Sequence, residues 1–239
     1  MSKKPPKDQH KKSKVLHTPK IVFRPNTAHE EFQQIVRTIK RKKFYEQKGY
    51  TYKLPEIAML REPISPKLET KALEIFIQSE YDEGFYKAGM SALENKRDVV
   101  ENAVKVFSKW NNKWEFFILD SYNIRLTRYG SGGSYNASTG DIVILTTREG
   151  CFKRGSNPAH TIIHEAVHIG LEKNFIKKYG LTHEQKERLV DLVVVQHFDT
   201  FIPEYKLQNI GDTTIDKFLN LKDMVSLDKQ LKSFANSQK

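Results

Sequence analysis

The sequence predicts an α+β fold, in which a twisted sheet, mixed or antiparallel, is backed by one helix and followed by a helical C-terminal part. Segments rich in β-branched and aromatic residues predict strands at residues 114–119, 124–127 and 141–146. Apolar residues at helical spacing predict the backing helix at residues 98–110 and two buried helices beyond residue 157. The strands precede the two buried helices, and this order is typical of α+β folds.

Further elements flank this core. Thr27 and Glu30 form a capping-box pattern that opens a basic amphipathic helix. Residues 50–67 contain three prolines and predict an irregular linker. Alternating apolar residues predict another strand at residues 70–78, and residues 222–234 predict a surface helix.

The first of the two buried helices has a clear predicted start. Asn157 is a favourable N-cap, and Pro158 suits the first helical position, where its missing N–H costs nothing. Further along, His164 and His168 are four residues apart, so both imidazoles point toward a common spot, which Glu165 flanks. This is the H-E-x-x-H pattern of zinc hydrolases, with two nitrogen ligands and a carboxylate that can accept a proton from bound water. The alternative is an ordinary core helix with two partly exposed histidines.

The second buried helix carries two acidic residues. Its start is predicted by a capping box, with Thr182 as the N-cap and Gln185 three residues later. Glu187 and Asp191 follow, and their four-residue spacing puts both carboxylates on one face. Because burial of an unpaired charge is costly, these carboxylates need partners. A metal site would supply them, and so would a salt bridge to a neighbouring lysine or arginine.

The two motifs together, His164-Glu165-x-x-His168 and Glu187-x-x-x-Asp191, resemble the gluzincin branch of the zincin metallopeptidases, the thermolysin-like arrangement. The resemblance implies a zincin-like metallopeptidase domain with a zinc ion held by His164, His168 and Glu187. It also implies that Glu165 is the general base and that Asp191 accepts an N–H from a ligating histidine.

Two other features bear on this resemblance. The metzincin branch is excluded, because Leu171 and Asn174 occupy the positions of its glycine and third histidine. Residues 130–145 are similar to the edge strand of zincins, which borders the cleft and binds extended peptide through main-chain hydrogen bonds. The resemblance covers about residues 122–200 and does not extend to the substrate.

The implied reaction is peptide-bond hydrolysis. Zinc lowers the pKa of a bound water from 15.7 toward about 7, and Glu165 would transfer its proton to the leaving amine. The oxyanion that forms needs a second donor besides the metal. The candidates are His197, Tyr179 and Tyr205, and each of them has an alternative reading as a packed or surface residue.

The positive charge of the chain lies in its N-terminal part. Residues 1–54 contain 15 Lys or Arg and 4 Asp or Glu, whereas the remainder contains 25 of each kind. We therefore expect a disordered basic tail at residues 1–20, a basic helix and linker at residues 21–65, and a catalytic domain at residues 66–239. The basic segment could bind nucleic acid or an anionic surface. The alternative function is a nucleic-acid-associated protein whose zinc site acts on a bound protein or is structural.

Composition excludes several classes of protein. No run of 18 apolar residues is present, which argues against a transmembrane segment. No apolar segment follows the N-terminal lysines, so we expect no signal peptide and a cytoplasmic location, with signal-less export as the alternative. The single cysteine, Cys151, excludes an internal disulfide and a cysteine-based zinc ribbon.

Overall fold

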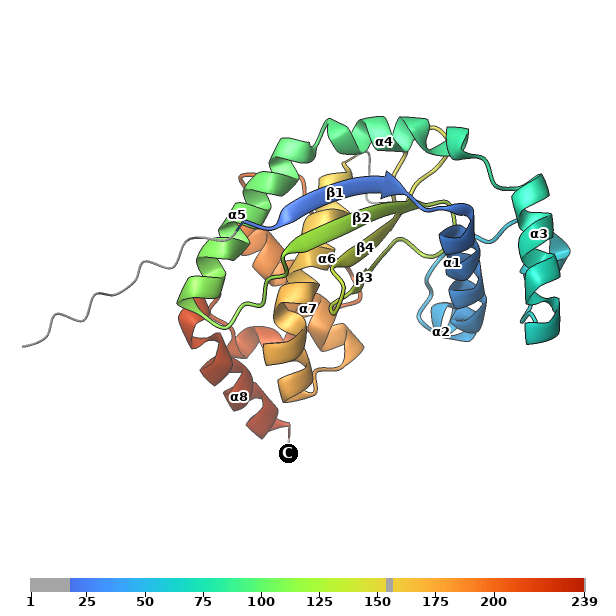
Figure 1. Cartoon of the computed structure of the whole chain (residues 1–239). Coiled ribbons are helices and arrows are strands. Elements are labelled where there is room, and N and C mark those ends of the chain that lie inside the picture. The colour runs from blue at the N-terminus through green and yellow to red at the C-terminus, as the bar shows by residue number, and fades with distance from the viewer. Residues whose placement is uncertain (1–17, 154–156, 239) are drawn as a thin grey trace, which may run out of the picture.

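The computed structural model describes residues 18–153 and 157–238. A four-stranded sheet has the order β1-β2-β4-β3 (Figure 1). Strands β1 (Lys20–Pro25), β2 (Ser121–Thr127) and β4 (Asp141–Leu145) are parallel, and the edge strand β3 (Gly133–Asn136) is antiparallel to β4. The sheet is mixed, and the predicted α+β class is confirmed.

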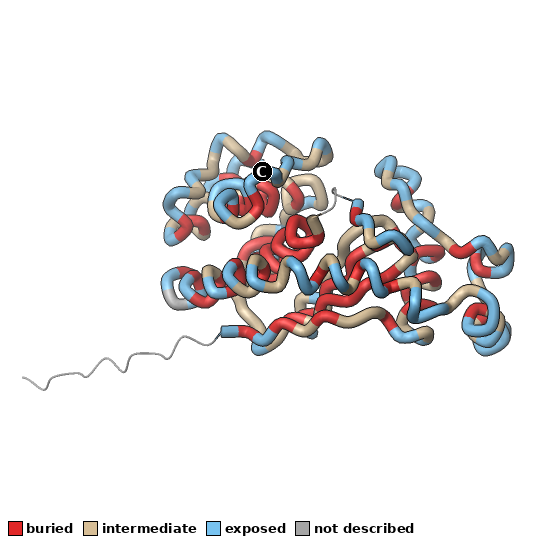
Figure 2. Tube along the Cα trace, turned by 90° about the horizontal axis from the view of Figure 1, so that it is seen from above, coloured by how far each residue is buried: buried red, intermediate tan, exposed pale blue. Residues whose placement is uncertain are grey.

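One face of the sheet is apolar and carries the main core. Because side chains alternate along a strand, most of the buried apolar residues of β1, β2 and β4 fall on this face, whereas Arg125, Thr127 and Val143 are buried on the other. Helix α4 (Lys87–Glu94) packs against β1, and α6 (Pro158–Leu171) packs against β3 and β4, with α5 (Arg97–Lys113) beside α6. Buried residues are concentrated in the centre of the molecule (Figure 2). The strand residues on the apolar face are Ile21, Phe23, Tyr122, Ile124, Leu126, Ile142 and Ile144.

The N-terminal helices form a second, smaller core beyond the carboxyl end of β1 (Figure 1). The helices that form it are α1 (Ala28–Lys40) and α3 (Glu69–Ser79), and α2 (Lys42–Gln47) follows the end of α1. The predicted capping box is present at the start of α1. The buried residues of this core are Phe32, Ile35, Ile39, Leu60, Ala72, Phe76 and Tyr129.

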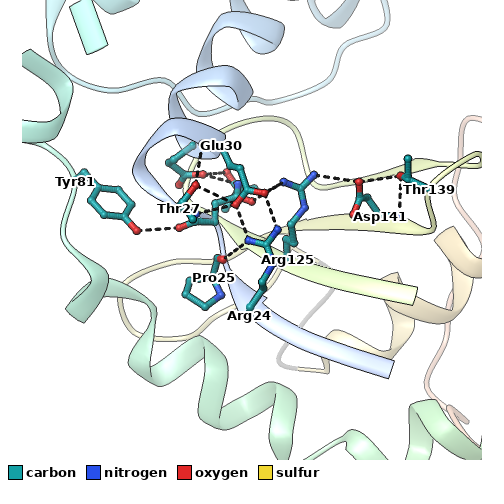
Figure 3. Close-up of polar contacts among 11 residues, drawn as sticks. Arg24, Pro25, Thr27, Glu30, Tyr81, Arg125, Thr139 and Asp141 are labelled. Atoms are coloured by element: carbon teal, nitrogen blue, oxygen red, sulfur yellow. Dashed lines mark hydrogen bonds and ion pairs between the residues drawn. The ribbon is translucent and has the colours of Figure 1, made fainter. Parts of the chain in front are cut away.

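An ion network joins α1 to the other face of the sheet (Figure 3). Glu30 accepts two hydrogen bonds of 2.6 Å from Arg24 on β1 and one of 2.9 Å from Arg125 on β2. Arg125 also lies 3.8 Å from Asp141 on β4. The hydrogen bonds from Arg24 lower the pKa of Glu30 to about 2. The network therefore connects three strands to the first turn of α1.

The C-terminal part is helical. A π-helical turn (Glu172–Lys177) continues α6, and α7 (His183–Phe198) and α8 (Leu227–Ser237) follow, with α7 packed against α6. Within the described ranges no helix is both long and apolar enough to cross a bilayer. The 3₁₀ helices of the chain are Ala58–Leu60, Pro66–Leu68, Glu83–Tyr86, Thr213–Phe218 and Met224–Ser226.

The strand predicted at residues 70–78 is wrong, because this segment lies in α3. Its buried side chains are Ala72 and Phe76, whose four-residue spacing is helical, whereas Ile77 is 46% exposed. The alternation of apolar residues here is therefore a by-product of a helix with a broad apolar face.

The strand predicted at residues 114–119 is also wrong. This segment packs on the end of α6, where the Phe117 N–H donates to the Gly170 carbonyl at 3.0 Å. A Cβ atom at Gly170 would lie 1.9 Å from the ring of Phe116, so only glycine permits this approach. The predicted strands at residues 124–127 and 141–146 are confirmed as β2 and β4.

Strand β1 was not predicted, and it changes the domain picture. Residues 20–25 pair with β2 in the central sheet, so the expected division at residues 65 and 66 does not separate the sheet from the N-terminal segment. Most of the tail expected at residues 1–20 lies outside the described residues.

Candidate metal centre

Helix α6 positions two of the predicted ligands. The Asn157 side chain accepts a hydrogen bond from the Ala159 N–H at 3.1 Å, and Pro158 occupies the first turn, as predicted. Every residue of α6 is buried, and His164 and His168 are each only 1% exposed. The alternative of two partly exposed histidines therefore does not describe this helix.

Three donor atoms converge at the face of α6 that meets α7. The Nε2 atoms of His164 and His168 lie 3.0 Å apart. The Oε2 atom of Glu187 lies 3.2 Å from the first and 3.4 Å from the second. Donors at about 2.0–2.1 Å from a tetrahedral zinc ion would lie about 3.3–3.4 Å from one another. The spacing and the donor types of this triangle thus fit a zinc ion.

The other nitrogen of His164 is held by two partners. Its Nδ1 atom lies 3.2 Å from the Oδ1 atom of Asp191 and 2.7 Å from the hydroxyl of Tyr205. Tyr205 in turn donates to Asp191. A carboxylate at Nδ1 favours a proton on that atom and leaves the Nε2 lone pair directed at the triangle. The Nδ1 atom of His168 is buried and has no hydrogen-bond partner among the described residues.

Gln208 contacts both Asp191 and Glu187. Its main-chain N–H donates to Asp191 at 2.5 Å, and its side-chain amide donates to the Oε2 atom of Glu187 at 3.1 Å. Gln208 follows α7 in a stretch without regular structure, where no sequence pattern singled it out. Its place at the site depends on the path of that loop.

The electrostatics favour the protonation states that a metal requires. Burial lowers the pKa of His168 to about 4, so its imidazole is neutral at neutral pH. Burial alone would raise the pKa of Glu187, but its interactions with His164 and His168 outweigh burial and hold it well below its usual range. The pKa of Asp191 is also lowered, because its hydrogen bond with His164 and further interactions outweigh the effect of burial.

Glu165, next to His164 on α6, lies against the edge strand. Its exposure is 8%. A Cβ atom at Gly133 on β3 would lie 2.3 Å from its Oε1 atom and 2.6 Å from the Thr161 side chain, so the strand can approach α6 only with glycine there. Two residues on, the Tyr135 ring stacks on His168 with centroids 4.9 Å apart. The edge strand therefore passes directly beside both the triangle and Glu165.

A groove of about 770 Å³ runs along this edge. Its lining includes residues 131–138, Thr161, His164 and Glu165 on the sheet and α6 side, and Glu187 on the α7 side. The predicted base and the donor triangle thus border a space large enough for several residues of an extended peptide.

The three oxyanion-donor candidates lie in different places. Tyr205 contacts one member of the donor triangle, His164, at its Nδ1 atom. Tyr179 donates to the Asp228 carboxylate at 2.7 Å, and the Nε2 atom of His197 lies 2.8 Å from the Leu221 carbonyl. The structure does not bring Tyr179 or His197 to the donor triangle.

The chain matches no protein-family model, no curated protein and no solved structure. The function is therefore inferred from the geometry of the site.

Proposed function

We propose that this chain is a zinc-dependent metallopeptidase that hydrolyses peptide bonds. The observation that carries the proposal is the buried triangle of two imidazole nitrogens and one carboxylate oxygen, with Glu165 beside it in an open groove. His164, His168 and Glu187 would hold the ion. A bound zinc ion polarises a carbonyl group and makes water acidic enough to react at neutral pH.

Glu165 is the proposed general base. In this role its carboxylate takes a proton from the attacking water and returns it to the leaving amine. The close approach of Gly133 limits the space around its Oε1 atom and so restricts the orientations of the carboxylate. Asp191 and Tyr205 have positioning roles, because they act on the reaction through the orientation of His164.

The edge strand supports a peptide as the substrate. The Leu145 N–H donates to the Gly132 carbonyl at 2.8 Å, and hydrogen-bonded pairs alternate along an antiparallel ladder. The main-chain groups of Gly133 and Tyr135 therefore point away from β4, toward the groove. An extended peptide could pair with these groups as an added strand. A mixed sheet with an antiparallel edge strand, followed by the ligand-bearing helix, also supports a zincin-like fold.

The test combines metal analysis with hydrolysis of a mixed peptide library. Wild-type protein should bind one zinc ion per chain, and His164→Ala or Glu187→Ala should lose it. Glu165→Gln should keep the fold and the metal but lose at least about 10²-fold in hydrolysis, because an amide cannot accept the proton.

Glu184→Gln is the matched control. This carboxylate lies on the same helix as Glu187, but it pairs with Lys48 away from the triangle. Both zinc content and hydrolysis should survive this change. Undiminished zinc in Glu187→Ala would contradict the third ligand, and full activity of Glu165→Gln would contradict the proposed base. Zinc binding without any hydrolysis by the wild type would indicate a structural metal site.

A further inference from the structure

We propose that the end of the groove formed by α1 and α2 binds a carboxylate group of the substrate, through Arg37 and Arg41. This inference rests on the proposed function, because it assigns a specificity to the same groove. Both arginines line the groove; Arg37 is in the last turn of α1, and Arg41, four residues on, is the C-cap of that helix.

Neither guanidinium group has a counter-ion among the residues that the structure describes. The side chains of Arg37 and Arg41 form no hydrogen bond or ion pair with any residue in the described ranges. Partial burial, and then the charge of Arg125, lower the pKa of Arg37, but an arginine remains charged at neutral pH. The nearby carboxylates of Glu30 and Asp141 already pair with Arg125. An anion that enters the groove would meet two unneutralised cations.

Aromatic side chains hold Arg41 in place. Its guanidinium carbon lies 5.1 Å from the centre of the Phe44 ring and 5.5 Å from that of Tyr45. Stacking of this kind fixes the plane of the guanidinium and leaves the N–H groups at its edge available. A planar fork of donors matches a carboxylate, which can accept two parallel hydrogen bonds.

The same aromatic residues connect the arginines to the metal centre. The Phe44 ring lies 5.6 Å from the ring of His183, whose Nδ1 atom lies 3.7 Å from the Oε1 atom of Glu187. Arg41 is therefore on the order of 15 Å from the donor triangle, which corresponds to about four or five residues of extended chain. A peptide bound along β3 would reach the arginines a few residues from its scissile bond.

Tyr50 joins the two sides of the groove at this end. Its hydroxyl lies 2.7 Å from the Nε2 atom of His183 on the α7 side. On the sheet side, the ammonium group of Lys153 lies 5.9 Å from the Tyr50 ring and bonds to the Ser131 carbonyl. Because Tyr50 and its contacts limit the groove at this end, the carboxylate could be the C-terminus of the substrate as well as an Asp or Glu side chain.

A nucleic acid fits this groove less well than a peptide carboxylate. The lining beyond the arginines includes Glu165, Glu172 and Glu187, together with Lys153, Lys177 and Lys186. A continuous phosphate backbone that crossed the groove would meet the carboxylates of Glu165 and Glu187 near the donor triangle, whereas a single carboxylate held at the arginines would not. The observations therefore favour an acidic or carboxyl-terminal group on a peptide.

The experiment measures both binding and hydrolysis with full-length, zinc-loaded protein. The probes are variants of one peptide selected from the library by binding, with Asp or Asn at each position in turn, and with a free or amidated C-terminus. Fluorescence anisotropy with the Glu165→Gln protein reports binding without turnover. The carboxylate peptides should bind about 10–100-fold more tightly than their neutral counterparts.

Arg37→Gln combined with Arg41→Gln should abolish this discrimination. Arg41→Lys keeps the charge without the planar fork of donors, so it should retain part of the discrimination between charged and neutral peptides. Lys40→Gln is the matched control, because Lys40 is exposed on the same helix but does not line the groove, and it should keep the discrimination. Circular dichroism of each variant checks that it is folded.

Each outcome decides between sources or overturns the proposal. Dependence on Asp alone identifies a side-chain carboxylate, and dependence on the free terminus identifies a C-terminal one. Equal binding of charged and neutral peptides by the wild type would overturn the carboxylate site, as would stronger arginine-dependent binding of a single-stranded oligonucleotide. If the wild type hydrolyses no peptide but binding still depends on both arginines, the proposed function fails and the carboxylate site stands.

Discussion

His164 uses both of its ring nitrogens, and this is the most informative residue-level feature of the molecule. Nε2 belongs to the donor triangle, while Nδ1 meets Asp191 and Tyr205. Asp191 is 1% exposed, and it also accepts the main-chain N–H of Gln208. The carboxylate thus connects a proposed ligand to the loop that covers the site.

We expect Asp191→Asn to weaken zinc affinity by about 10–100-fold, the usual range for partners that orient a ligating histidine. The amide oxygen can still accept the His164 N–H, but without charge, so the loss should be smaller than in Glu187→Ala. Titration of zinc into the metal-free variants measures the difference. Asp216→Asn is the control. Asp216 pairs with Arg188, which lies on α7 as Asp191 does, so this substitution should affect stability alone. A purely thermal defect in Asp191→Asn would assign Asp191 to the scaffold.

At the scale of elements, a carboxylate in the first turn of α1, that of Glu30, pairs with arginines on two strands of the sheet. Glu30 bonds to Arg24 and Arg125, and it also closes the capping box with Thr27. The carboxylate therefore has two separable roles, an ionic one and a helix-capping one. Glutamine can perform the capping role, as Gln185 does at the start of α7.

Glu30→Gln should destabilise the protein more at neutral pH than at low pH. The folded-state pKa of about 2 lies below the usual 4.5, so the carboxylate contributes stability that is complete above about pH 4.5 and is lost as the pH falls toward 2. We expect a loss of about 1–2 kcal/mol at pH 7, after allowance for solvent screening. Urea unfolding at pH 7 and near pH 2.5 measures it. Glu74→Gln, an exposed carboxylate on α3, should show no such dependence; an equal loss at both pH values would contradict the ionic role.

An element could be predicted from the sequence where its caps and its apolar pattern lie within the element itself. Helices α6 and α7 have caps and long apolar stripes in their own sequences, and both were predicted with their donor residues. Strand β1 has only a short alternation of Ile21 and Phe23 beside a basic segment, and its partner lies far along the chain. Gln208 reaches the site through an irregular loop, so no local periodicity marks it. The positions of β1 and Gln208 depend on residues far along the chain, and they could not be predicted from local sequence patterns.

At the scale of the whole molecule, the N-terminal residues from Lys20 onward are part of the scaffold. Strand β1 extends the sheet on the side opposite β3, and α1 builds the second core with α3. The basic residues from Lys20 onward are therefore carried by this scaffold, and two of the arginines line the proposed substrate groove.

We expect a chain that begins at residue 55 to lose cooperative folding. It would lack five buried Ile and Phe side chains, each worth about 1.5–3 kcal/mol, and their sum is comparable to the about 5–15 kcal/mol that stabilises a domain. Thermal melting followed by circular dichroism, with the full chain alongside, tests this. A cooperative transition at the temperature of the full chain would instead support an independent domain at residues 66–239. The five side chains are Ile21, Phe23, Phe32, Ile35 and Ile39.

The pairing of β1 with β2 also sets an order of events during synthesis. Lys20 lies opposite Ser121, so this ladder closes only after about one hundred further residues have left the ribosome. The three proposed ligands emerge later still, and Glu187 is the last of them. For the proposed peptidase activity this order would be protective, because the nascent chain can already form the sheet that borders its groove before it can complete the proposed metal centre.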